Sequence, residues 1–178
     1  MTQEEANEAL LSAAHKGDVE ALKAALAAGA DANVPTGYGR SIADILAFNG
    51  RAEGLKLLID SGADVTHCSA LITAAYVGYD ECVKMLVAAG ADVNAPNDCD
   101  ETPLMYMVEY GCADAVRMLL DAGADVHAVS SVNDKKVQLK PSCPQPQKEE
   151  IRELLSTAKK MLNYLLNKKK CRLIYYLL

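Results

Sequence analysis

The chain has 178 residues, of which 51% are hydrophobic, and its formal net charge at pH 7 is −6. This length and apolar content are enough to bury the core of one domain. No apolar run has the length of a membrane span, and the acidic N-terminus lacks the basic and then apolar pattern of a signal peptide. We therefore expect an intracellular protein, either cytoplasmic or nuclear.

Six cysteines occur along the chain, and none of them is spaced like a zinc ligand or a redox pair. Reduced thiols in an intracellular protein explain such a pattern most simply. We expect no metal and no cofactor. The cysteines are Cys68, Cys82, Cys99, Cys112, Cys143 and Cys171.

Charge divides the chain into two parts. Residues 1–127 contain 7 Lys and Arg against 20 Asp and Glu, whereas residues 128–178 contain 11 against 4. An acidic block of this kind repels phosphate, so nucleic-acid binding is not expected there. The basic C-terminal part is left to contact acidic partners or the acidic block itself.

A short phrase recurs through the acidic block. Ala-Gly-Ala-Asp occurs at 28–31, 89–92 and 122–125, and Ser-Gly-Ala-Asp occurs at 61–64. The glycines of these phrases lie 33, 28 and 33 residues apart. This period predicts four units, at about 4–33, 34–66, 67–94 and 95–127.

The first unit is expected to close one end of the array, because polar residues precede its apolar positions. In the second unit, Gly37 and Gly39 flank a hairpin tip. They do not form a phosphate loop, because no Walker lysine or dinucleotide-binding spacing accompanies them. The third unit is five residues short, and the deficit lies between Val65 and Leu71. Neutral shortening of a loop explains this deficit, and a gap that admits a ligand is the alternative.

The fourth unit has the clearest pattern. Pro103 suits a first helical turn, and Thr102 before it is expected to cap the exposed amides. Gly111 ends this helix, and the second helix carries Leu119 in an apolar stripe that needs neighbours of the same kind.

A turn followed by two antiparallel helices, repeated at 33 residues, resembles the ankyrin repeat. The Thr-Pro-Leu-His signature of that family is matched by Thr102-Pro103-Leu104-Met105, with Met105, Asp44 and Ile72 at the histidine position of three copies. The resemblance implies an all-α solenoid of stacked repeats. It also implies a concave groove, formed by hairpins and first helices, that holds another protein.

After residue 127 the repeat pattern stops. Residues 128–147 contain several prolines and are predicted to form a loop, whereas 148–166 have apolar residues at helical spacing and are predicted to cap the stack. The tail 167–178 combines three lysines, a cysteine and bulky apolar residues. A packed helix end is the favoured interpretation, and a membrane tether or a complex-binding motif are the alternatives.

No catalytic set is present in the sequence. His15, His67 and His127 fall in different units, and no Ser-His-Asp arrangement, metalloprotease motif or phosphate loop occurs. We therefore do not expect an enzyme.

Aromatic residues provide the strongest indication of a binding surface. None of the six in the acidic block aligns with a core position of the repeat, which favours an interface, although packing between neighbouring repeats is the alternative. We predict a protein partner, with a basic surface, bound by a monomer. The predicted contact residues are Tyr38, Arg40, Phe48, Tyr76, Tyr79, Asp98, Glu101, Tyr106, Glu109 and Tyr110.

Two functions agree with this pattern. The first is a non-catalytic protein–protein interaction module. The second is an adaptor or targeting subunit, whose repeats bind cargo and whose tail engages a membrane or a larger complex. A ubiquitin-ligase adaptor is the weakest form of this second function. The tail only distantly resembles the elongin-binding box of such adaptors, because Asn167 stands where that box has a leucine.

Overall fold

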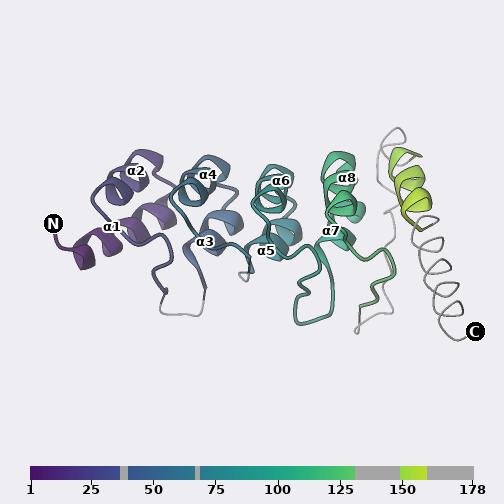
Figure 1. The fold of residues 1–178 in the computed structure, drawn as a ribbon, viewed down its shortest axis with the longest axis horizontal. Helices are drawn as coiled ribbons and strands as arrows, with labels where there is room; N and C mark the ends of the chain where they lie inside the picture. Colours follow the sequence, from purple (N-terminus) through teal and green to yellow (C-terminus); the bar gives the residue numbers. More distant parts are fainter. Residues whose placement is uncertain (37–39, 67–68, 131–148, 160–178) are drawn as a thin grey trace, which may run out of the picture.

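The computed structural model describes residues 1–36, 40–66, 69–130 and 149–159. Helices follow one another in pairs along a single row, and the described residues contain no β-strand (Figure 1). The predicted all-α solenoid is confirmed. The helices are α1 Gln3–Lys16, α2 Val19–Ala27, α3 Ile42–Phe48, α4 Ala52–Asp60, α5 Ala70–Val77, α6 Asp80–Ala88, α7 Pro103–Tyr110 and α8 Ala113–Asp121.

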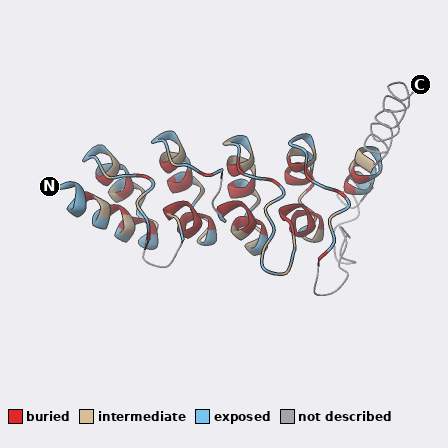
Figure 2. Ribbon diagram, turned by 60° about the horizontal axis from the view of Figure 1, so that its bottom comes forward, coloured by how far each residue is buried: buried red, intermediate tan, exposed pale blue. Residues whose placement is uncertain are grey.

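The row has two layers. The first helices of the pairs, α1, α3, α5 and α7, pack side by side, and the second helices, α2, α4, α6 and α8, form the other layer. Buried residues lie where the layers meet and where neighbouring pairs touch (Figure 2). The large buried side chains are mostly the leucines that the helical spacing predicts. They include Leu10, Leu22, Leu46, Leu55, Leu58, Leu71, Leu86, Leu104 and Leu119.

Two first helices begin with a complete capping box. In α1, Thr2 accepts from the amide of Glu5, whose carboxylate accepts in return from the amide of Thr2. In α3, Ser41 and Asp44 make the same exchange. Each box satisfies donors that the first turn of a helix leaves without partners.

The predicted cap at Thr102 is wrong in one respect. Thr102 is the N-cap residue of α7, but its side chain makes no capping bond, and its Oγ1 is buried without a partner. The amide of Met105, which would donate to a capping hydroxyl, donates instead to the backbone carbonyl of Thr102 (3.1 Å). Met105 also has no carboxylate that could accept from the amide of Thr102, so the second half of a capping box is missing as well.

Asparagine side chains tie neighbouring repeats together at the turn that follows each second helix. Asn33 donates to the carbonyl of Gly62 (3.3 Å) and accepts from the amide of Asp64 (2.7 Å). Asn94 makes the same pair of bonds with Gly123 (3.2 Å) and Asp125 (2.8 Å). These bonds fix the register of one repeat on the next.

The junction between the second and third repeats has a different bond. Thr66 occupies the asparagine position there, and its hydroxyl donates to Asp64 in its own turn. Ser69 instead donates to the buried Asp44 (2.9 Å), which links the starts of α5 and α3. The linker here is residues 61–69, compared with 28–41 and 89–102 at the neighbouring positions.

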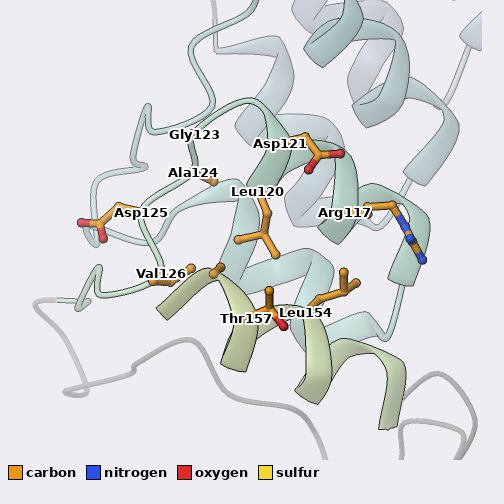
Figure 3. Close-up of a pocket in the computed structure, with 10 residues that line it drawn as sticks. Arg117, Leu120, Asp121, Gly123, Ala124, Asp125, Val126, Leu154 and Thr157 are labelled. Carbon is orange, nitrogen blue, oxygen red and sulfur yellow. The ribbon is translucent and has the colours of Figure 1, made fainter. Parts of the chain in front are cut away.

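Residues 149–159 form a further helix that covers α8. Ile151 and Leu155 are buried, and Arg117 of α8 forms an ion pair with Glu150. A groove of about 570 Å³ lies between the two helices. Figure 3 shows Leu120 on one side of it and Leu154 on the other. The helix predicted to cap the stack therefore packs on the last repeat over these residues.

Several predictions fall outside the described residues. They concern Tyr38, His67, the larger part of the proline-containing loop 128–147, and the tail 167–178. No helix among the residues described is long and apolar enough to cross a membrane.

Replacing Thr66 with Asn should stabilise the stack, because the amide can make the two bonds that Asn33 and Asn94 make elsewhere. We expect the free energy of unfolding in urea to rise by about 0.5–1.5 kcal/mol. The reverse change at the next junction, Asn94→Thr, should lower it. A stability that stays the same or falls in Thr66→Asn would show that the shortened linker holds position 66 out of reach.

Leu119→Ala should destabilise the protein by about 2–5 kcal/mol, because the residue is fully buried in α8. Leu120→Ala is the matched control, since Leu120 is only partly buried and borders the groove. Its cost should be less than half as large. Equal losses in thermal or urea unfolding for the two variants would contradict the burial seen in the structure.

Candidate partner-binding surface

The ends of successive first helices present aromatic side chains to solvent. Phe48, Tyr76 and Tyr110 lie at or next to the last residues of α3, α5 and α7, and their exposed fractions are 49%, 58% and 43%. Tyr79, at the start of α6, is 39% exposed. These four residues lie at or just after the ends of the first helices of three successive repeats, and we call them the aromatic row.

The turn glycine of each repeat is covered by a side chain of the next repeat. A Cβ on Gly50 would lie 2.7 Å from the ring of Tyr79, and one on Gly17 would lie 2.3 Å from Nε of Arg51. Both glycines also have positive φ, which side chains disfavour. Tyr79 therefore packs between repeats and remains partly exposed, which agrees with the alternative interpretation of its role.

Tyr110 and Tyr76 are joined across the junction between the third and fourth repeats. The hydroxyl of Tyr110 donates to the carbonyl oxygen of Tyr76 (2.9 Å). The ring of Tyr76 meets the ring of Tyr106 edge to face, with centroids 5.5 Å apart and planes at 85°. Such pairs stabilise a fixed ring orientation. The middle of the aromatic row is thus held in one arrangement before any partner arrives.

Tyr106 corrects the prediction that no aromatic residue occupies a core position. It is only 5% exposed and belongs to the hydrophobic core, so it cannot contact a partner over its ring as predicted. Its hydroxyl donates to Glu101, and Asn97 donates to both residues. Burial, and then the bond to Glu101, raise the pKa of the Tyr106 hydroxyl well above its usual value. It stays protonated at every physiological pH.

Asn97, which the sequence pattern does not single out, organises the loop that leads into α7; we call the loop before the first helix of a repeat its finger. Its side-chain oxygen accepts from the amides of Cys99 (2.9 Å) and Glu101 (3.0 Å). Asp100 in the same turn has a φ of 56°. This geometry leaves Asp98 and Asp100 exposed at the finger, whereas Glu101 is turned inward to Tyr106.

The remaining predicted contacts differ in position. Arg40 is exposed, and its carbonyl accepts from Thr36 on the opposite side of the second finger. Glu109 is half-buried beside Tyr110 at the end of α7. The structure therefore brings Tyr76, Tyr110 and Glu109 into one region, and Arg40 belongs to a finger two repeats away.

Lys84 is the one lysine or arginine between residues 57 and 116. It lies on α6, where it pairs with Asp80 (3.3 Å) and Glu81 (2.8 Å) and approaches Asp114 of α8 (3.9 Å). The finger and first helix of the fourth repeat contribute Asp98, Asp100, Glu101 and Glu109, whereas those of the third repeat contribute no acid, and neither contains a lysine or arginine. This part of the surface has an acidic character.

Thiol and metal chemistry find little support in the described part of the chain. Burial, followed by the charge of Glu81, raises the pKa of Cys82 to about 11, so its thiol is a poor nucleophile at neutral pH. Over the same residues, no group of three or more His, Cys, Asp and Glu side chains is arranged to hold a metal ion.

Two family models match the chain. One, described as ankyrin repeats in three copies, matches residues 47–130, and another, described as ankyrin repeats in many copies, matches residues 10–59. The chain belongs to the ankyrin-repeat family. Ankyrin repeats are generally protein–protein interaction modules and are typically non-catalytic. A search of curated proteins found no match.

Tyr106→Phe should lower the free energy of unfolding by about 1–3 kcal/mol, because it leaves Glu101 and Asn97 without their bond to the buried hydroxyl. Tyr110→Phe is the matched control. Its hydroxyl is at an exposed site, so the loss should be smaller than for Tyr106→Phe in urea unfolding. A larger loss in the control would show that the hydroxyl of Tyr110, and not that of Tyr106, holds this region.

Proposed function

We propose that this protein is a non-catalytic binding module that holds a protein partner on the side formed by its first helices and fingers. The observation that carries the proposal is the aromatic row, Phe48, Tyr76, Tyr79 and Tyr110, exposed on three successive repeats. Large aromatic side chains are enriched among the residues that dominate binding energy at protein interfaces.

The fixed geometry of the row supports this role. The side chain of Tyr110 is restrained by its hydrogen bond, and the ring of Tyr76 is restrained by its contact with Tyr106, so both lose little freedom when a partner binds. Isolated exposed apolar residues are common on protein surfaces. A line of restrained rings across three repeats is a stronger sign of an interface than the same residues scattered over the molecule.

Acidic residues would have a different role in the same contact. Asp98 is exposed on the fourth finger and Glu109 lies beside Tyr110. Charges at the rim of an interface mainly change the association rate and its dependence on salt. We infer that the aromatic row anchors the partner and that the acids guide a basic surface toward it.

A combined Phe48→Ala, Tyr76→Ala and Tyr110→Ala variant should lose the partner while remaining folded, because these rings are 49%, 58% and 43% exposed. Partners captured from cell extract by the wild-type chain are identified, purified and titrated against both proteins. We expect affinity to fall at least tenfold, since interface anchors often contribute about 2 kcal/mol or more each.

The control is Lys23→Ala with Lys56→Ala, which changes exposed residues of α2 and α4 in the second-helix layer. This variant should bind as the wild type does. An unchanged affinity in the aromatic variant, or an equal loss in the lysine variant, would place the binding surface elsewhere.

A further inference from the structure

Tyr76 presents the most exposed aromatic ring of the described residues, at 58%. The ring packs edge to face on Tyr106, and the backbone carbonyl of Tyr76 accepts from Tyr110. The Tyr76 ring therefore contacts Tyr106 on one side and is open to solvent on the other. Such a ring can receive a flat group on its free side.

The fourth repeat, whose Tyr106 packs against this ring, is the source of the acidic residues on this side. Tyr106, its direct neighbour, bonds to Glu101, and Glu109 lies next to Tyr110. The fourth finger adds Asp98 and Asp100, both exposed. Residues 66–79 and 95–112, which supply the fingers and first helices of these two repeats, contain no lysine or arginine.

Phe48 occupies the same repeat position as Tyr76, at the end of α3, but its surroundings differ. Arg40 and Arg51 belong to the same repeat, and both are exposed. Asp44, the acid nearest in sequence, is buried and bonded to Ser41 and Ser69. The repeat of Phe48 therefore carries two exposed arginines, whereas residues 66–79, which include Tyr76, carry none.

We propose that Tyr76 of the third repeat and the acidic residues of the fourth repeat bind an arginine side chain of the partner. The guanidinium stacks flat on the free side of the Tyr76 ring, while its N–H groups meet the carboxylates nearby. This inference rests on the proposed function and adds the partner's chemistry: a basic segment lies over the third and fourth repeats. Lysine fits less well, because its compact ammonium cannot stack in this way.

The test titrates the full-length, isotope-labelled chain with a tri-arginine peptide at low salt, and compares tri-lysine and tri-citrulline at equal concentrations. Citrulline keeps the shape of arginine without its charge. We expect tri-arginine to bind most tightly, tri-citrulline to show no binding, and amide shifts to concentrate around Tyr76, Glu101 and Tyr110. This comparison needs no variant, so it does not depend on the folding of a mutant.

Tyr76→Ala should weaken tri-arginine binding by about threefold or more, as expected for loss of a cation–π contact at an exposed site. Tyr76→Phe keeps the ring and should retain most of the affinity. Phe48→Ala is the matched control and should leave the affinity unchanged, because its repeat contributes exposed arginines.

Equal binding of tri-citrulline, unchanged affinity in Tyr76→Ala, or an equal loss in Phe48→Ala would overturn the inference. Equal affinity for tri-lysine would overturn the choice of arginine. These outcomes are separate from the test of the proposed function. If a captured partner requires the aromatic row for binding and yet is not displaced by tri-arginine, that result would support the proposed interaction module and contradict only the arginine site.

Discussion

Burial of apolar surface between successive repeats is the interaction on which the rest of this molecule depends. After α1, every helix labelled in Figure 1 has only 7 to 9 residues, which is too short to be stable alone in water. Their leucines are buried only because the neighbouring pair covers them. Each repeat thus supplies part of its neighbour's core, and the solenoid is stable as a sum of such contacts.

Polar contacts at the junctions determine how one repeat sits on the next. The asparagine bonds at Asn33 and Asn94 align the turns, and side chains that cover turn glycines align the ends of the first helices. The aromatic row follows from this alignment. Its members come from separate repeats, so a shift in the stacking of one repeat would separate them even if every helix stayed intact.

The period of the glycine phrases was sufficient to predict the helix pairs and most of the buried leucines, because both follow from local spacing. Tyr106 could not be assigned so simply. The equivalent position in the second repeat is the buried Ile45. A tyrosine can be buried at this position only if the finger supplies partners for its hydroxyl. In the folded turn, Glu101 and Asn97 are those partners. The missing cap at Thr102 could not be predicted either, because the amide of Met105 donates to the carbonyl of Thr102 rather than to its hydroxyl, and this choice is a detail of the backbone geometry. The aromatic row was predicted from its repeat positions, whereas its restraint by neighbouring side chains required the structure.

The substitution of Thr66 at the asparagine position has a consequence for the molecule under mechanical load. When the stack is stretched from its two ends, every junction bears the same force. The junction between the second and third repeats holds Ser69 on Asp44 in the first-helix layer, but it has threonine where its neighbours have the asparagine clamp. At this junction, the second-helix layers of the two repeats would separate before the first-helix layers. Phe48 and Tyr76 lie on opposite sides of the junction, so this separation would divide the aromatic row. The junction that lacks the asparagine bonds therefore passes through the surface that we assign to the partner.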